Sequence, residues 1–371
     1  MKEINNVMVL FGGVSTEHAI SCRSAHTIIK GLKAAGYNVI PVGITLEGEW
    51  LPFRLDLDKI REENWVELTK ADLAQEEFPA ISLKELSSPK AYLRYLCGGI
   101  DVDLVYLALH GINAEDGVIQ GLLELCDIPY IGANLISSAI SMDKAYTKLL
   151  IENSDIPQLD FVICHREDIN NSIDSVIADV ERLGYPVFLK PANGGSSVGT
   201  YKVNNAEELR QSLIEAAEFD HKVLAEPFYL AREVEIACLG NHKAKTAVAG
   251  EIVKSADVEY YDYKTKYISA DGAKVQIPAD IKAETMQKLQ DYAKRIYSLL
   301  EINGLSRIDF FVSPDESEIY FNEINTLPGF TSISLFPVAW EKEGLELPQL
   351  LKEICELGLE AYEQQKRKID V

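Results

Sequence analysis

The stretch Val187-Phe-Leu-Lys190-Pro-Ala-Asn-Gly-Gly-Ser-Ser-Val-Gly199-Thr-Tyr-Lys-Val203 holds two apolar runs separated by a glycine-rich loop. The runs at 187–190 and 201–203 predict two short strands, because β-branched and aromatic residues there are bounded by turn residues. Glycines let the backbone approach a ligand closely, and hydroxyl groups with free N–H groups suit phosphate oxygens. The stretch therefore predicts a phosphate-covering loop between two strands, with Lys190 as a cation at its entry.

This loop has other interpretations. Gly195-Ser-Ser197-Val-Gly199 fits the G-x-S-x-G nucleophile elbow, and a serine hydrolase would use Ser197 with His110 and an acid. That motif needs a strand before it and a helix directly after it, whereas a strand is expected here. A purely structural glycine turn is the other alternative. No Gly-Lys-Ser/Thr sequence closes the loop, so it is not a Walker A loop.

A second chemically informative stretch is the predicted hairpin Arg307-Ile-Asp309-Phe-Phe … Tyr320-Phe-Asn-Glu323-Ile-Asn325. Residues two apart in a strand share a face, so Arg307 points with Asp309, and Glu323 points with Asn325. If Val312 pairs with Tyr320, the antiparallel register sets the two acids opposite each other. Two carboxylates and an amide oxygen are hard ligands that suit Mg²⁺. The alternative is a solvated strand face, which is common in antiparallel sheets.

The N-terminal third alternates strand and helix patterns, which predicts an open parallel sheet. The expected elements are strands at 7–11, 38–44 and 104–109 and helices at 17–35 and 120–126. Residues from about 47 to 100 are polar and weakly periodic, and we expect an insertion of short elements there. The loops that follow the strands, at Gly12–Glu17 and from His110, lie where open α/β sheets bind ligands.

The remaining two thirds of the chain predict a mixture of strands and helices. Strands are expected at 161–164, 187–190, 201–203, 233–239, 245–252, 308–312 and 319–325, and helices at 144–153, 206–219, 281–300 and 349–367. A polar, tyrosine-rich segment, 255–272, interrupts the third part of the chain and has the composition of a surface loop.

Composition excludes several classes of protein. The chain has 371 residues and a net charge of −22, from 36 Lys+Arg against 58 Asp+Glu. This length predicts two or three domains. The acidic balance argues against binding to nucleic acid or to anionic membranes, and no apolar run approaches the roughly 20 residues that span a bilayer. Six scattered cysteines predict buried thiols in a reducing cytoplasm.

Taken in order, the motifs of this chain resemble those of the D-alanine–D-alanine ligase family of the ATP-grasp superfamily. The matching stretches are Phe11-Gly-Gly-Val-Ser-Thr-Glu-His-Ala-Ile-Ser21, Leu109-His-Gly, Glu115-Asp-Gly-Val-Ile-Gln-Gly121, Pro129-Tyr-Ile-Gly132, Ser138-Ala-Ile-Ser-Met-Asp-Lys144, Lys190-Pro, Gly195-Ser-Ser-Val-Gly199, Tyr261-Asp-Tyr-Lys-Thr-Lys-Tyr267, Arg307-Ile-Asp309 and Asn322-Glu-Ile-Asn-Thr-Leu-Pro-Gly-Phe-Thr331. The resemblance covers the chain except for about residues 47–100.

The resemblance implies an α/β protein with three-domain ATP-grasp architecture. The expected domains are an N-terminal open parallel α/β substrate domain at 1–131, a central ATP-grasp subdomain at 132–232 and a C-terminal ATP-grasp subdomain at 233–371, with the segment 255–272 as a lid. It also implies a cytoplasmic homodimer that ligates two D-alanine molecules through an acyl phosphate, for peptidoglycan synthesis. ATP and Mg²⁺ (or Mn²⁺), as two ions, are the implied cofactors.

The resemblance also assigns roles to residues. The ATP-binding positions are Lys144, Lys190, Ser197, Glu226, Phe228, Glu233, Tyr260 and Lys266, and the metal ligands are Asp309, Glu323 and Asn325. The first D-alanine is expected at Glu17 and His110, with Ser196 and Tyr267 linking Glu17 to the lid. Arg307 and the N–H of Gly329 stabilise the oxyanion, and Lys266, Ser334 and Leu335 receive the second D-alanine.

Three alternatives are left open beside this reaction. Relatives that make D-alanyl-D-serine or D-alanyl-D-lactate are similar, but the apolar Leu335 suits a methyl side chain and the lid keeps Tyr267. A non-catalytic nucleotide-binding regulator would not need the hairpin's arginine, acids and asparagine, which are all present. The serine hydrolase described above would require no ATP.

Overall fold

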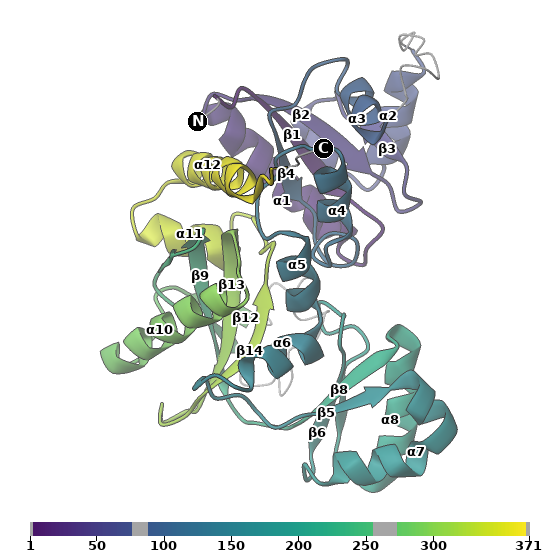
Figure 1. The fold of residues 1–371 in the computed structure, drawn as a ribbon, viewed down its shortest axis with the longest axis vertical. Helices are drawn as coiled ribbons and strands as arrows, with labels where there is room; N and C mark the ends of the chain where they lie inside the picture. The colour runs from purple at the N-terminus through teal and green to yellow at the C-terminus, as the bar shows by residue number, and fades with distance from the viewer. Residues whose placement is uncertain (1–2, 76–87, 255–272, 369–371) are drawn as a thin grey trace.

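The computed structural model describes residues 3–75, 88–254 and 273–368. Tyr260, Lys266, Tyr267 and the predicted lid at 255–272 lie outside the described residues. The described chain forms three β-sheets with helices packed on them, stacked along the long axis of the molecule (Figure 1). The predicted α/β class is therefore confirmed.

The first sheet has the strand order β3-β2-β1-β4. The strands are β1 (Asn6–Gly12), β2 (Asn38–Ile44), β3 (Trp50–Pro52) and β4 (Leu104–Ala108). β1 pairs in parallel with both β2 and β4, which confirms the predicted parallel sheet, and only β3 runs antiparallel to its neighbour. The helices of this part are α1 (His18–Ala34), η1 (Leu57–Arg61), α2 (Trp65–Leu73), α3 (Pro89–Leu96) and α4 (Val118–Leu125).

The second sheet is antiparallel, with the order β5-β8-β6-β7. Its strands are β5 (Val162–His165), β6 (Val187–Pro191), β7 (Tyr201–Val203) and β8 (Lys222–Pro227). The helices α7 (Arg166–Glu181) and α8 (Ala206–Phe219) pack on one face and bury Val187, Leu189, Val223 and Ala225. Because side chains alternate along a strand, Phe188, Lys190 and Glu226 point to the opposite face.

The third sheet has the order β12-β11-β9-β13-β14, with β10 paired to β9. Its strands are β9 (Arg232–Gly240), β10 (Ala244–Thr246), β11 (Gly250–Lys254), β12 (Ala273–Gln276), β13 (Gly304–Val312) and β14 (Ile319–Asn325). The helix α10 (Ala283–Leu299) covers one face, where its apolar residues share a core with Ile236, Ile308 and Phe310. The strand predicted at 245–252 is wrong, since β10 and β11 are separate strands.

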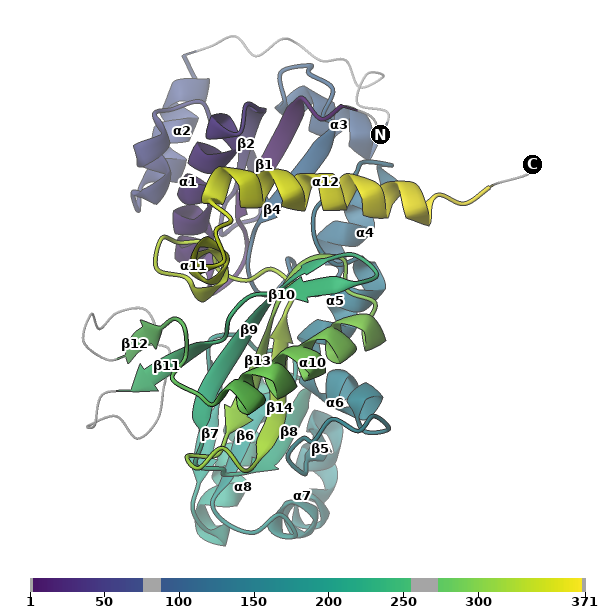
Figure 2. The same cartoon turned by 90° about the vertical axis from the view of Figure 1, so that its left-hand side faces the viewer.

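Four further helices remain. α5 (Leu135–Met142) and α6 (Lys144–Ile151) connect the first sheet to the second, and α11 (Leu335–Lys342) and α12 (Leu347–Gln365) follow the third. Although α12 is the last helix, it lies across the first sheet and α1 (Figure 2). It approaches α1 so closely that a Cβ atom on Gly31 would lie 2.4 Å from Leu351 Cδ1. The C-terminal segment thus completes the core of the N-terminal part, and the exact domain boundaries stay a prediction.

Two smaller expectations can also be compared with the fold. All six cysteines are buried and unpaired, as the sequence predicts. Within the part of the chain that the structure describes, no helix has both the length and the apolar character needed to cross a membrane.

Candidate active site

Two adjoining cavities lie among the described residues. The first, about 1230 Å³, lies between the second and third sheets, and the second, about 750 Å³, lies against the first sheet. Both are lined by Lys144, Gly194, Gly195, Ser196 and Glu323. These shared residues form the boundary where a group bound in one cavity could meet a group bound in the other.

The first cavity collects most of the predicted nucleotide-binding residues. Its lining includes Lys144, Lys190, Ser197, Glu226, Phe228 and Glu233 together with Asp309 and Glu323. Phe188 and Phe228 supply aromatic rings 5.8 Å apart at one end, and the glycine loop and the lysines supply polar groups at the other. An apolar slot next to cations suits a planar base attached to phosphates.

One buried carboxylate in this cavity is shared by two lysines. Glu226 Oε2 accepts a hydrogen bond from Lys190 Nζ at 2.8 Å, and Glu226 Oε1 lies 2.6 Å from Lys148 Nζ. Burial alone would raise the pKa of Glu226, but the two ammonium groups outweigh burial and lower the pKa to about 2. Lys148 is absent from the sequence-based assignments because a lone lysine inside a helix carries no local signal.

The start of α6 holds Lys144 at the boundary of the two cavities. Asp143 caps the helix by accepting the N–H groups of Ala145 and Tyr146, each at 3.0 Å, and its other oxygen pairs with the buried Lys222 of β8. Lys144 Nζ donates to the Gly194 carbonyl at 2.7 Å. The same ammonium lies 3.3 Å from Glu323. The cap therefore places a cation between the glycine loop and the hairpin acids.

The hairpin of β13 and β14 brings the two predicted acids together by a different register from the expected one. Val312 pairs with Ile319, not with Tyr320, so the assumed pairing is wrong by one residue. A β-bulge at Asn322 inserts one extra residue, and Asp309 then lies opposite Glu323 as expected. The bulge re-aims the last residues of β14 toward the cavities.

Arg307 and the hairpin's polar residues form one tight cluster. The guanidinium of Arg307 donates to both carboxylate oxygens of Asp309, at 2.8 and 2.7 Å, and lies 3.2 Å from Glu235. Asn325 Nδ2 donates to Asp309 at 3.1 Å. Burial would lower the pKa of Arg307, but Asp309 and Glu235 raise it well above its ordinary value. Glu235, on β9, was not predicted from the sequence.

The donor atoms of this cluster fit a divalent cation. Asp309, Glu323 and Asn325 offer two carboxylates and one amide oxygen at the junction of the cavities, which are the hard ligands of Mg²⁺ and Mn²⁺. Within residues 3–75, 88–254 and 273–368, no three His, Cys, Asp or Glu side chains form a metal-binding group by themselves. A divalent cation held here would use the amide oxygen of Asn325 beside the two carboxylates, and oxygens of a bound phosphate would complete its coordination.

The second cavity joins the first sheet to the glycine loop. The hydroxyl of Ser196 donates to Glu17 Oε1 at 2.6 Å, across 179 residues of chain. Ser196 and Ser197 have positive φ angles of 52° and 58°, which turn the loop over the cavity. Glu17, Ser196 and Arg307 all line this cavity, so the structure brings together residues that the sequence leaves far apart.

His110 and Ser24 hold the turn that contains Gly329. His110 Nδ1 lies 2.9 Å from the Leu327 carbonyl, which only accepts, so Nδ1 carries the proton. Its Nε2 accepts from the Ser24 hydroxyl at 3.0 Å, and Ser24 Oγ accepts the Phe330 N–H at 3.3 Å. Burial lowers the pKa of His110, which favours this neutral form. The buried histidine thus positions the turn.

Glu115 is a further residue that was not assigned a role from the sequence. Its carboxylate accepts the N–H groups of Gly111 at 2.9 Å and of Leu327 at 3.0 Å, and it lines the second cavity. Burial first, and then the nearby charge of Glu17, raise the pKa of Glu115 to about 7. The Glu115-Asp-Gly motif contained this residue, but its partner Leu327 lies 212 positions away.

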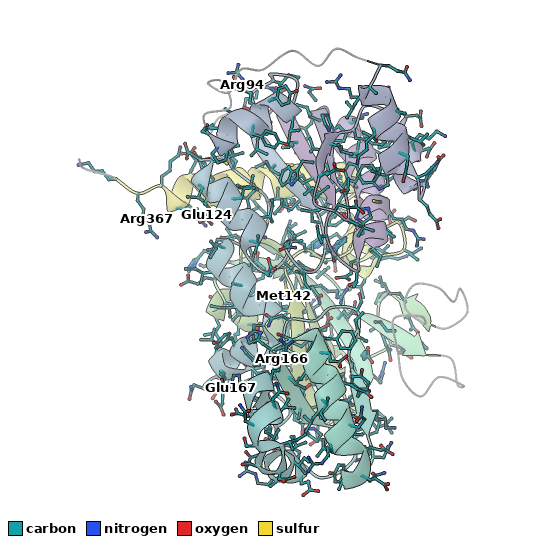
Figure 3. All side chains as sticks on the ribbon, turned by 90° about the vertical axis from the view of Figure 1, so that its right-hand side faces the viewer. Arg94, Glu124, Met142, Arg166, Glu167 and Arg367 are labelled. Atoms are coloured by element: carbon teal, nitrogen blue, oxygen red, sulfur yellow. The ribbon has the colours of Figure 1, made fainter. Side chains whose placement is uncertain are left out.

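Ser334 and Leu335 lie beside the second cavity and are not among its lining residues. Ser334 Oγ accepts the Thr331 N–H at 3.0 Å and lies 3.1 Å from the place where a Cβ on Gly329 would stand. Leu335 is buried against Gly250. Met142, the last residue of α5, is labelled in Figure 3 and lines the second cavity.

The serine-hydrolase interpretation of the glycine loop is wrong. The loop leads from strand β6 into strand β7, so no helix follows Ser197. In addition, both ring nitrogens of His110 are hydrogen-bonded to Leu327 and Ser24. The two nitrogens of His110 are therefore already engaged, and the ring is not left to act as a base for Ser197.

Comparisons with known proteins identify the family of this chain. The family models described as D-ala D-ala ligase N-terminus and C-terminus match residues 6–133 and 150–356. The D-alanine–D-alanine ligase of Acetivibrio thermocellus is 40% identical over 381 residues, covering 100% of both chains, and that of Clostridium novyi is 41% identical, covering 95% of this chain and 98% of its own.

Solved structures are similar over the whole chain as well. The D-alanine–D-alanine ligase from Coxiella burnetii has a TM-score of 0.80 at 31% identity and covers 98% of this chain and 96% of its own. The VanG D-Ala:D-Ser ligase from Enterococcus faecalis has a TM-score of 0.81 at 34% identity, covering 96% and 100%. The chain belongs to the D-alanine–D-alanine ligase family and has its three-part ATP-grasp fold.

Proposed function

We propose that this chain joins two D-alanine molecules in an ATP-dependent reaction, with the nucleotide in the first cavity and the amino acids in the second. The observation that carries this proposal is the boundary that the cavities share, where Lys144, Ser196 and Glu323 face both. A carboxylate bound in the second cavity can there approach a terminal phosphate bound in the first. Full-length relatives with this activity support the same reaction.

The first step forms an acyl phosphate. A carboxylate oxygen of D-alanine attacks the γ-phosphorus, the bond to the β-phosphate breaks, and ADP leaves. The carboxylate is by itself a poor acyl donor, and phosphorylation gives it a good leaving group. Lys144 and Lys190 would offset the charge of the phosphates. The other nucleotide contacts in this proposal are Ser197, Glu226, Phe228, Glu233, Tyr260 and Lys266.

Glu17 would hold the ammonium of the first D-alanine, beside His110. The hydrogen bond from Ser196 orients the Glu17 carboxylate, and Tyr267 would extend the link to the lid. Two Mg²⁺ or Mn²⁺ ions, held by Asp309, Glu323 and Asn325, would supply positive charge to the phosphates when bound. Exclusion of water protects the acyl phosphate from hydrolysis.

The second step forms the peptide bond. The neutral amine of the second D-alanine attacks the acyl carbon, and the tetrahedral intermediate expels inorganic phosphate, which carries away the proton that the nitrogen loses. Arg307 and the N–H of Gly329 would stabilise the oxyanion, because both line the second cavity. His110, through the Leu327 carbonyl, holds the turn that presents this N–H. Lys266, Ser334 and Leu335 would receive the second substrate.

We propose D-alanine as the second substrate over D-serine or D-lactate. Leu335 lies beside the second cavity with its apolar side chain buried against Gly250, so this position offers no polar side chain to a serine hydroxyl, which supports a methyl group in the substrate. The solved relative that uses D-serine keeps this chain's fold, so fold similarity alone does not discriminate between the substrates.

Phosphate release from Mg-ATP tests the proposal, with D-alanine, D-serine and D-lactate offered singly and in pairs. We expect D-alanine alone to suffice and to yield the dipeptide. Release that requires D-serine or D-lactate beside D-alanine would contradict the proposed second site, and no release with any of them would contradict the reaction itself. A homodimer in a bacterial cytoplasm is the proposed context, and light scattering on the purified chain measures the assembly.

A further inference from the structure

The interface between α6 and β8 contains a lysine that the proposed mechanism does not use. The side chain of Lys148 is 1% exposed, and its ammonium lies 2.6 Å from Glu226 Oε1. Lys148 lines neither cavity, whereas Glu226 and Lys190 both line the first. The charge of Lys148 is therefore screened from any bound ligand by the carboxylate between them.

Stability alone does not account for this arrangement. Taking two opposite charges out of water costs several kcal/mol for each ion, and apolar residues of similar volume often do as well or better at such a place. The same interface already has a second buried pair, Asp143 with Lys222, and an apolar contact through Ala145 and Leu224. Lys148 adds a charge where packing does not require one.

The charges around Glu226 explain what Lys148 supplies. Lys190 is the more exposed of the two lysines, at 19%, and its ammonium lies 2.8 Å from Glu226 Oε2. Suppose that Lys190 were the single partner of Glu226. A phosphate that drew the Lys190 ammonium away would then leave the buried carboxylate of Glu226 without a compensating charge. The array formed by Lys148, Glu226 and Lys190 carries two positive charges and one negative charge, so one positive charge remains after Glu226 is compensated.

We propose that Lys148 is a positioning residue that neutralises Glu226 and so leaves the charge of Lys190 available to a nucleotide phosphate. This inference rests on the proposed nucleotide site and goes beyond it, because Lys148 acts without touching the ligand. The array is a phosphate-binding device in which the buried lysine balances the acid and the exposed lysine binds the anion.

The test compares how much the phosphates add to binding in each variant. Calorimetry gives the Kd of adenosine and of Mg-ADP, and their ratio measures the phosphate contribution within one protein. In Lys148→Met we expect this ratio to fall by about tenfold, the size of one hydrogen bond to a charged group. Adenosine binding should persist, which also shows that the variant is folded.

A paired neutralisation separates this role from a structural one. The double variant Lys148→Met with Glu226→Gln removes the positive charge of Lys148 and also the negative charge that it balances. The ratio of the two Kd values should therefore return toward the wild-type value. Glu226→Gln alone should give a ratio at least as large as wild type, and this variant provides the test if Lys148→Met does not fold. The exposed Lys288→Met on α10 changes net charge equally and should leave the ratio unchanged.

Three results would overturn this inference without touching the proposed function. The first two are an unchanged ratio in Lys148→Met and a lowered ratio in Glu226→Gln. A double variant no better than Lys148→Met would do the same, since a packing defect is not repaired by removing a charge elsewhere. A wild-type chain that binds neither adenosine nor Mg-ADP would instead contradict the nucleotide site, and the inference with it.

Discussion

Single side chains at the junction of the two cavities depend on geometry as much as on charge. Arg307 makes a two-point contact with Asp309 and approaches Glu235, so its orientation is set before any substrate binds. A lysine carries the same charge but cannot make this planar, two-point contact. The guanidinium shape, and not only its charge, therefore places a donor in the second cavity.

We predict that Arg307→Lys lowers kcat by roughly 10²–10³, the usual cost of losing one oxyanion donor. The KM of ATP should change little, because Arg307 does not line the first cavity. Steady-state kinetics of phosphate release measure both quantities. Arg232→Lys is the matched control, since Arg232 makes a similar two-point contact with Glu251 on the same sheet. Equal losses in both variants would contradict a catalytic role for Arg307.

Glu115 gives a pH dependence whose sign follows from its raised pKa. A carboxyl whose pKa rises from 4.5 to about 7 on folding binds its proton more tightly in the folded chain. Its contribution to stability is therefore present below pH 4.5 and is lost as the pH rises to about 7.

We predict that the free energy of unfolding of wild type, relative to Glu115→Gln, falls by about 3 kcal/mol between pH 4.5 and 7.5. Urea unfolding at several pH values measures this difference, and other titrating groups cancel between the two proteins. A difference that stays constant with pH would show that Glu115 keeps its ordinary pKa in the fold.

At the scale of elements, α6 shows how a short helix is fixed by two buried ion pairs on one strand. Asp143 pairs with Lys222 at its first turn, and Lys148 pairs with Glu226 one turn later. Both partners lie on the same face of β8, because residues two and four apart in a strand point the same way. The helix consequently has one register against the sheet, and Lys144 has one position.

We predict that Asp143→Asn costs about 3–5 kcal/mol, because it keeps the helix cap but leaves the buried Lys222 unpaired. Asp143→Ala should cost about 0.5–2 kcal/mol more, since the cap is lost as well. Adding Lys222→Met to Asp143→Asn should restore most of the stability. Urea unfolding of the four proteins measures these steps. Strictly additive effects would show that the two residues do not interact.

At the scale of the whole molecule, the two ends of the chain fold together. Leu350, Leu351, Ile354 and Cys355 of α12 are fully buried in the core that also contains β1 and α1. The candidate active site lies where the first sheet meets the glycine loop and the hairpin. The last helix therefore supports the substrate cavity without contributing a residue to its lining.

We predict that truncation after Glu346 abolishes folding of the N-terminal part. Each large buried apolar side chain that is lost costs about 2–5 kcal/mol, and several together exceed the 5–15 kcal/mol of a typical domain. Thermal unfolding followed by circular dichroism, with gel filtration, measures this effect. Truncation after Gln365 is the control, and it should leave the thermal unfolding transition and the gel-filtration profile unchanged. A cooperative, wild-type-like transition in the shorter chain would refute the role of α12.

Comparison of the predicted and observed elements shows where local patterns were sufficient. The strands β1, β2, β7 and β14 and the helices α1, α8, α10 and α12 lie within a few residues of their predictions, because each has clear periodicity or flanking turn residues. Among the described elements outside residues 47–100, five were not predicted: α5, α7, α11, β8 and β12. In α7 the apolar spacing is weak and the backbone kinks at Ser172. In β8, Lys222 and Glu226 are charged yet buried.

The sequence by itself determined most of the order of strands and helices, the glycine loop, and which face of the β13–β14 hairpin carries Arg307, Asp309, Glu323 and Asn325. These properties depend on neighbours within a few residues, whose spacing sets which face each side chain occupies. The tertiary structure alone decided how those groups act. The bulge at Asn322 brings Asp309 opposite Glu323. The contacts Lys148–Glu226, Glu115–Leu327 and Ser196–Glu17 join residues that are between 78 and 212 positions apart. Electrostatic pairing depends on distances in space, which no local pattern encodes.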